Sequence, residues 1–227
     1  MIEQQPKPSI PLRAPPSTRI TWPLLVAIGL GGVGIAWFLA TDAGVYLVYA
    51  PEKYTDYYWP RRAGLIFHVS AGALALTIGL LQIFLGLSGR TRKLHRVFGR
   101  VYLGTVLVGV SASCYLAATI PAGSPVYTSG LIGLGIAWFF TTVAGYRALL
   151  RGNIAGHRAW MLRSFAVTFS FVILRVIAMI IAGLGLMTYD DATSPAAWLC
   201  WIIPLTVLEI GYRRWGWGEQ RITMPAA

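Results

Sequence analysis

The chain has 227 residues, of which 56% are hydrophobic and only 12% charged, and its mean hydropathy is +0.62. Soluble domains are less apolar and more charged, so this composition excludes an ordinary soluble protein. The net charge of +11 is concentrated in short loops beside apolar segments, where it sets membrane orientation and attracts anionic lipid headgroups. Outside those loops no basic stripe with interleaved aromatic residues occurs, so we do not expect nucleic-acid binding.

Residues 1–20 are polar and contain five prolines, which predicts a disordered cytoplasmic tail. The stretch is too long and too rich in proline for the basic start of a signal peptide. No small-residue cleavage site follows the first apolar run. We therefore interpret the first apolar segment as a retained signal anchor.

Six apolar segments follow, each close to the ~20 residues that an α-helix needs to cross a ~30 Å hydrocarbon core. They run over 22–40, 64–88, 99–120, 129–149, 160–186 and 196–212. The sequence predicts an all-α fold, an integral membrane six-helix bundle that forms a single domain over residues 21–214. A short cytoplasmic tail is expected over 215–227.

The basic residues predict how the helices are oriented. With both termini in the cytoplasm, fifteen of the nineteen Lys and Arg residues lie on the cytoplasmic side. Only Lys53, Arg61 and Arg62 lie outside, and Arg175 lies within a span. Because loops rich in Lys and Arg stay in the cytoplasm, we expect both termini there and the protein in the inner (plasma) membrane.

The longest predicted connection, over residues 41–62, is rich in aromatic side chains. They are Tyr46, Tyr49, Tyr54, Tyr57, Tyr58 and Trp59. Two interpretations are open: an aromatic belt at headgroup level, with or without a short helix lying on the membrane, and a lid over an outward-facing pocket. We favour the belt, since Tyr and Trp are enriched at the membrane interface.

The sequence lacks the motifs of several cofactor-binding and enzyme classes. The two cysteines, Cys114 and Cys200, lie toward the outer ends of spans three and six, and two buried thiols are favoured over a disulfide. The chain has no CxxC, no CxxCH and no Cys/His cluster, which argues against zinc, iron–sulfur and covalently attached haem sites. It also has no P-loop, GxSxG or HExxH, which disfavours a hydrolase or an ATP-driven pump.

One face of span two carries small residues between a histidine and a glutamine. At 100° per residue the aligned positions are His68, Gly72, Ala75, Gly79, Gln82 and Gly86. The simpler interpretation is close packing of helices through small residues. A flat cofactor lying against the helix would need the same groove, and packing alone does not explain the histidine.

Spans three and five each begin with a His-Arg pair after a basic hairpin. Residues 94–102 and 156–164 form a weak internal repeat with an offset of 62 residues, in parallel orientation. The repeat predicts that His95 and His157 lie at the same depth on the same side of the membrane.

Polar residues continue along both helices from these histidines. From His157 the same face carries Ser164 and Thr168, and from His95 it passes Tyr102 to Ser113. We expect polar residues aligned on otherwise apolar helices to point at each other inside the bundle.

Two charged residues lie within the predicted spans. Arg175 lies five turns after His157, near mid-membrane, and Glu209 lies nearer the cytoplasmic end of span six. Side chains lean toward the start of their own helix, which brings these two together across antiparallel helices. We predict an ion pair or a water-bridged pair between them, the alternative being an anionic ligand or lipid group that holds Arg175.

These segments together resemble a known family. They are His68 with Gln82, residues 94–102 and 156–164, Arg175, and residues 197–201 with Glu209. Over roughly residues 62–214 the pattern resembles a bacterial family of predicted multi-pass membrane proteins classed as domain of unknown function 2306. The resemblance implies the architecture and no established activity. A looser similarity to cytochrome b-type membrane bundles exists, but one outer and two inner histidines exclude two bis-histidine haems.

The leading functional hypothesis is a membrane redox protein. His95 and His157 would be the axial ligands of one b-type haem near the cytoplasmic face, and Lys93, Arg96 or Arg158 would neutralise its propionates. A less demanding interpretation is favoured over it, in which both histidines cap helix starts or contact headgroups. Copper or another metal shared by the histidines is a further alternative.

The remaining candidates belong to other classes. His68 is a candidate for handling protons or quinone, because a histidine titrates near neutral pH. A small-molecule transporter or carrier would use a central cavity around Gln82, Arg175 and Glu209, although matched helix breaks at mid-membrane are absent. An assembly factor for a membrane complex would act through the glycines of span one. No catalytic residue can be named.

Overall fold

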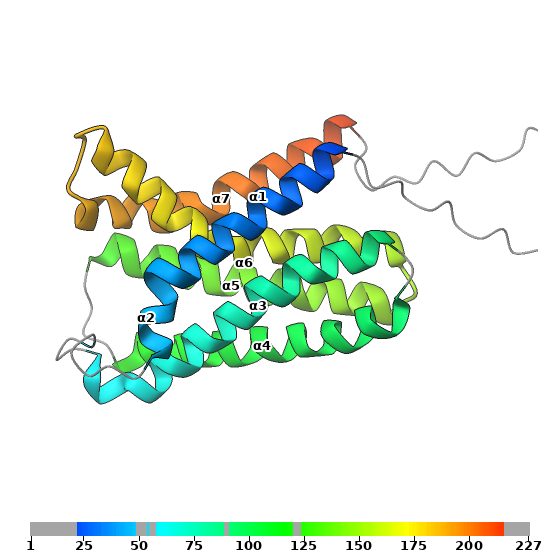
Figure 1. The fold of residues 1–227 in the computed structure, drawn as a ribbon, viewed down its shortest axis with the longest axis horizontal. Coiled ribbons are helices and arrows are strands. Elements are labelled where there is room, and N and C mark those ends of the chain that lie inside the picture. Colours follow the sequence, from blue (N-terminus) through cyan, green and yellow to red (C-terminus); the bar gives the residue numbers. More distant parts are fainter. Residues whose placement is uncertain (1–21, 49–53, 55–57, 89–90, 120–123, 216–227) are drawn as a thin grey trace, which may run out of the picture.

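The computed structural model describes residues 22–48, 54, 58–88, 91–119 and 124–215. The predicted tail over 1–20 lies outside the described residues, as do Tyr49 and Tyr57. The predicted tail over 215–227 also lies outside them except for Trp215, which is the last residue of α7. Figure 1 shows the fold. In chain order its elements are α1 (Trp22–Phe38), the π-helical turn η1 (Leu39–Ala43), α2 (Gly44–Leu47), the 3₁₀ turn η3 (Trp59–Arg61), α3 (Arg62–Ser88), α4 (Arg92–Thr119), α5 (Pro125–Leu150), α6 (Ile154–Gly183) and α7 (Tyr189–Trp215).

The all-α prediction and the six spans are confirmed. Six helical segments are long and apolar enough to cross a membrane, and the described residues contain no strand. α4, α5 and α6 begin several residues before the apolar windows that predicted them. Two of the starts are set by polar caps that a hydropathy window does not detect. Ser124 accepts a hydrogen bond from Tyr127 N, and Asn153 accepts one from Gly156 N.

α6 ends three residues earlier than predicted, at Gly183. The chain leaves the helix through Gly185, which has φ +68°, a left-handed conformation that glycine adopts without steric cost. Its N–H donates to Ala182 O at 2.9 Å, and Leu186 N–H donates to Ile181 O at 3.3 Å. These bonds satisfy carbonyls at the helix end, although the following residues remain apolar.

The centre of the fold is a four-helix bundle of α3, α4, α5 and α6. α3 packs against α4 and α6, and α5 also packs against α4 and α6, so α4 and α6 occupy diagonal corners. α7 covers α5 and α6, whereas α1 crosses α3 and α6 on the outside (Figure 1). We call the end where α1 begins and α7 ends the basic end. α4 and α6 both start there and run parallel.

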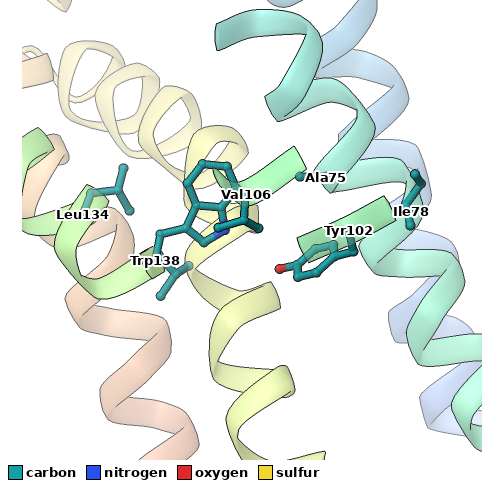
Figure 2. Close-up of a cluster of buried hydrophobic side chains, with 7 residues drawn as sticks. Ala75, Ile78, Tyr102, Val106, Leu134 and Trp138 are labelled. Atoms are coloured by element: carbon teal, nitrogen blue, oxygen red, sulfur yellow. The ribbon is translucent and has the colours of Figure 1, made fainter. Parts of the chain in front are cut away.

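The core of the bundle contains large side chains from all four helices. Tyr102 and Trp138 are each only 2% exposed and pack with Val106 and Val167. Figure 2 shows the Tyr102 hydroxyl and the Trp138 indole directed toward the interior beside α6. Both polar tips are thus placed in an apolar interior, where they need hydrogen-bond partners.

The aromatic segment before α3 packs against the end of the bundle opposite to the basic end. Tyr54 is buried with Leu65 and Leu116, its ring meets Tyr46 and Trp59 edge to face, and its hydroxyl donates to Tyr46 O at 2.9 Å. A belt side chain would face the headgroups, so the belt interpretation does not hold for Tyr54.

Both cysteines are free thiols, as favoured from the sequence. Cys200 is buried beside Ala197, but Cys114 lies exposed on the outside of α4. The prediction of two buried thiols is therefore wrong for Cys114, whose position faces away from the other helices.

Candidate functional site: the histidine pair and the polar interior

His95 and His157 occupy equivalent places on parallel helices. His95 is the fourth residue of α4, and His157 is the fourth residue of α6. Because these helices start at the same end of the bundle, the two histidines lie at a similar depth. The structure thus places the two inner histidines at equivalent positions on diagonal helices.

The ring of His157 is oriented by the helix before it. Its Nδ1 lies 3.0 Å from Gly145 O on α5. A carbonyl can only accept, so Nδ1 carries the proton and Nε2 keeps its lone pair. Gly145 is closely packed as well, because a Cβ there would lie 2.6 Å from Met161 Sδ.

His95 is supported in a similar way by α3. A Cβ on Gly86 would lie 3.4 Å from His95 Cε1, so the ring rests against a glycine. The Gln82 side chain donates its Nε2–H to His95 O at 2.7 Å. The main-chain carbonyl of Gln82 lies near the ring, but His95 Nδ1 makes no hydrogen bond and is buried. Gln82 Oε1 and Thr91 Oγ1 are also buried without a partner, so polar groups at this end are unsatisfied.

Basic side chains surround the pair. Arg158 follows His157 directly and lies close enough to His95 for their charges to interact. Lys93 and Arg96 are exposed at the start of α4. None of these three cations forms an ion pair with a carboxylate in the part of the chain that the structure describes.

Deeper in the bundle, hydroxyl groups of three helices form a closed network. The Tyr102 hydroxyl lies 2.8 Å from both Ser164 Oγ and Thr168 Oγ1. Trp138 Nε1–H donates to Thr168 Oγ1 at 2.8 Å, and Thr142 Oγ1 lies 2.7 Å from Ser164 Oγ. The prediction that the polar faces of spans three and five meet is confirmed.

Counting protons fixes the direction of these bonds. Thr168 donates its single hydroxyl proton to Ser164 O at 2.9 Å, so it accepts from Tyr102 and Trp138. The Tyr102 proton is then used on Thr168, and Thr142 likewise donates its proton to Trp138 O at 2.7 Å, so Ser164 has one proton for two acceptors, Tyr102 and Thr142. Trp138 and Thr142 were not among the residues predicted from the sequence, although an indole followed one turn later by hydroxyls on an apolar span was a usable signal.

His68 lies apart from the pair. Its Nδ1 lies 2.9 Å from Ser113 Oγ, which itself donates to Gly109 O at 2.8 Å, so the ring nitrogen is the donor. The ring of Phe171 packs edge to face on His68, with the centroids 6.0 Å apart. Fourteen residues separate His68 from Gln82 on α3, roughly 21 Å along the axis. His68 is therefore no third ligand beside His95.

The small-residue face of α3 is filled by aromatic side chains. A Cβ on Gly79 would lie 2.5 Å from the Phe165 ring and 3.1 Å from Tyr102. Ala75 is fully buried, and Gly72 faces Phe171. The packing interpretation is confirmed between Gly72 and Gly79, where the aromatic rings leave no space for a flat cofactor.

The helices of the bundle match one known protein family. The family described as "Predicted membrane protein (DUF2306)" matches residues 65–211, more than half of the chain. The chain belongs to this family. No curated protein and no solved structure matches it. The DUF2306 region contains α3 to α6 and most of α7, including both histidines of the pair, and leaves out α1.

Arg175, inside the DUF2306 region, pairs with a residue outside it. Arg175 Nε donates to Asp42 Oδ2 at 2.5 Å, and its Nη2 donates to Asp42 Oδ1 at 3.1 Å. The predicted partner Glu209 is therefore wrong. Asp42 was expected in an outer loop, but η1 and α2 continue the first helix and keep its carboxylate beside α6.

Glu209 joins α7 to α6 at the basic end instead. It accepts from Arg163 Nη2 at 2.6 Å and from Arg213 Nε at 3.1 Å, and its side chain is 43% exposed. The Arg163 guanidinium lies over the rings of Trp160 and Tyr212, at 5.0 and 4.4 Å from their centroids. Glu209 is thus not the buried charge that was predicted.

The three residues assigned to a transporter cavity do not converge. Gln82 contacts His95, Arg175 pairs with Asp42 and Glu209 bonds to Arg163. The central space between them is occupied by the packed network described above. Among the described residues no three His, Cys, Asp or Glu side chains gather as a metal site.

Proposed function

We propose that this DUF2306 protein is a membrane redox protein that holds one b-type haem between His95 and His157. The observation that supports it most is the matched pair of imidazoles on diagonal, parallel helices. Two imidazole nitrogens are a common axial ligand set of haem iron. A metal-ligating histidine usually donates its other N–H to a carbonyl, as His157 does toward Gly145.

The residues around the pair fit this group. His95 Nδ1 is a buried nitrogen without a partner, and a ring displaced toward the Gln82 carbonyl would acquire one. Glycines stand behind both rings, at Gly86 and Gly145, so the rings can be set close to the neighbouring helices. The axes of packed neighbouring helices are about 8–10 Å apart, and the axes of diagonal helices are farther apart than this. The wider spacing is what two imidazole rings with an iron between them would require.

A bound haem would supply one-electron transfer, and the protein would supply its environment. Arg158 and Arg96 would neutralise the propionates at the basic end. Phe98 and Met161, one turn deeper than the histidines, pack on the apolar core and would exclude water. Tyr102, two turns deeper than His95, closes the interior, so the site would open toward the basic end.

The alternative is that both histidines only contact headgroups or cap helices. His157 argues against it, because its ring is turned to the Gly145 carbonyl of the neighbouring helix and not outward. His95 likewise rests against Gly86 inside the hairpin. Both rings thus rest against neighbouring helices, which supports a role within the bundle.

The test is the visible absorption spectrum of the full chain, purified after expression with added haem precursor. We expect a Soret band, a six-coordinate low-spin spectrum and one haem per chain. His95→Ala and His157→Ala should each abolish the low-spin spectrum. His68→Ala is the matched control and should keep it, because His68 lies roughly 21 Å away along α3.

Two outcomes would reject the proposal. One is a chain that stays colourless after expression with haem precursor and after reconstitution with haem in detergent. The other is an unchanged spectrum in both His95→Ala and His157→Ala. Size-exclusion chromatography of each variant checks that the bundle is intact.

A further inference from the structure

The hairpin of α5 and α6 carries a hollow that the proposed haem site does not use. It has a volume of about 410 Å³, and exposed residues near the end of α5 and the start of α6 line it, at the basic end. Six of its lining residues matter here: Phe140, Arg147, Arg151, Asn153, Gly156 and Trp160. They combine two cations with apolar and aromatic surface.

The two arginines at the hollow are not neutralised by the protein. Arg147 and Arg151 are one helical turn apart and exposed, a spacing at which like charges repel. Within the described ranges Glu209 is bonded to Arg163 and Arg213, and no carboxylate pairs with either arginine of the hollow. An anion between the two guanidinium groups would remove this repulsion.

The other end of the hollow is aromatic. Phe140 and Trp160 meet edge to face with centroids 5.6 Å apart. Phe140 precedes Arg147 by seven residues, which is about 10 Å along α5 and away from the basic end. The hollow therefore extends from a cationic mouth at the helix ends into the apolar depth of the bundle surface.

The start of α6 keeps the mouth open and electropositive. Gly156 carries no side chain, and a Cβ there would lie 2.7 Å from the Asn153 amide. Asn153 instead caps the helix and lines the hollow. The positive end of the α6 dipole points to the same place, which favours a negative charge there.

We propose that this hollow binds an anionic phospholipid, with its phosphate between Arg147 and Arg151 and the start of one acyl chain along Phe140 and Trp160. The two uncompensated guanidinium groups favour a phosphate by charge complementarity. The apolar rings at the other end favour an acyl chain that continues into the bilayer. Basic pockets between transmembrane helices bind anionic headgroups in this way. The site is independent of the histidine pair.

The test compares lipid binding by the full chain in nanodiscs of phosphatidylcholine with and without phosphatidylglycerol. Exchange of a spin-labelled phosphatidylglycerol reports occupancy. We expect preferential binding of the anionic lipid, weakened about tenfold in Arg147→Gln/Arg151→Gln. The matched control is Arg100→Gln/Arg214→Gln, which removes the same charge from exposed positions at the same end and should change binding less than about twofold.

A second variant separates the lipid from a free anion. Phe140→Ala should speed the release of phosphatidylglycerol, whereas inorganic phosphate should not displace it. Equal losses of phosphatidylglycerol binding in the two double variants would show a general effect of charge and overturn the proposal. Displacement by inorganic phosphate without any effect of Phe140→Ala would leave an anion site only, and the lipid would be the wrong occupant.

Discussion

The Tyr102 hydroxyl lies 2.8 Å from the Ser164 hydroxyl, although 62 residues separate them in the chain. The same offset relates His95 to His157, so residues at equivalent positions of the repeat meet inside the bundle. This contact ties the diagonal helices α4 and α6 two turns below the histidine pair. It also shows that the network and the pair depend on the same alignment of the two helices.

Removing the Tyr102 hydroxyl tests the network. Tyr102→Phe keeps the ring in the core but leaves Ser164 and Thr168 without one partner each. We expect a loss of about 1–2 kcal/mol in the free energy of unfolding, since hydrogen bonds within membranes contribute about this much. Thermal unfolding in detergent measures it. Tyr115→Phe, at an exposed position of α4, is the control and should change little.

Close packing at Gly79 gives a second prediction. A Cβ there would lie 2.5 Å from the Phe165 ring, so Gly79→Ala should destabilise the bundle by about 1–3 kcal/mol. Gly104→Ala is the matched control, because no atom lies within 4 Å of its added Cβ. The control should be neutral or stabilising by up to about 1 kcal/mol, as alanine favours helix. Equal melting temperatures for the two variants would contradict the packing described here.

The ion pair between Asp42 and Arg175 should attach the first helix to α6. Asp42→Ala and Arg175→Ala should each weaken this attachment. The double variant should lose less free energy of unfolding than the two single variants lose together. We expect a coupling of about 1 kcal/mol in a double-mutant cycle of unfolding, because the partly exposed pair lies at membrane depth. Spin labels on α1 and α6 would report a longer separation in the single variants. Additive losses would mean that the pair contributes nothing.

The orientation of the bundle is a prediction that labelling can check. Leu150 and Leu186 are both 68% exposed, at the basic end and at the opposite end. In a chain with Cys114→Ser and Cys200→Ser, we expect Leu186→Cys to react with an impermeant maleimide on intact cells. Leu150→Cys should react only after the membrane is opened, because basic loops stay in the cytoplasm. The reverse pattern would invert the predicted topology.

The sequence predicts the architecture well because lipid imposes one rule on every span. A backbone in hydrocarbon must satisfy its own hydrogen bonds, so apolar length alone identifies the helices. The facing polar surfaces of α4 and α6 were also predictable, since His95, Tyr102, His157 and Ser164 keep helical spacing. Helix starts were predicted too late, because Asn153 and similar caps lie outside the apolar windows.

The partners of the charged residues were harder to predict. Arg175 was assigned to Glu209 by depth and side-chain direction, but a π-helical turn carries Asp42 to α6. A π-turn inserts a residue into the helical register, and the local sequence does not reveal it. Arg163 was taken as a cytoplasmic charge, yet its planar guanidinium stacks between Trp160 and Tyr212. Such contacts depend on tertiary placement.

The diagonal contact of Tyr102 with Ser164 limits how alike the two hairpins can be. The hairpins α3–α4 and α5–α6 make corresponding contacts, α3 with α6 and α5 with α4, and the Tyr102–Ser164 contact joins the repeat-related helices α4 and α6. Two tyrosines could not share that point, and two serines would leave a void. One large and one small partner fill it, so the two hairpins must differ where they touch, and any molecule bound between α4 and α6 meets two unlike walls.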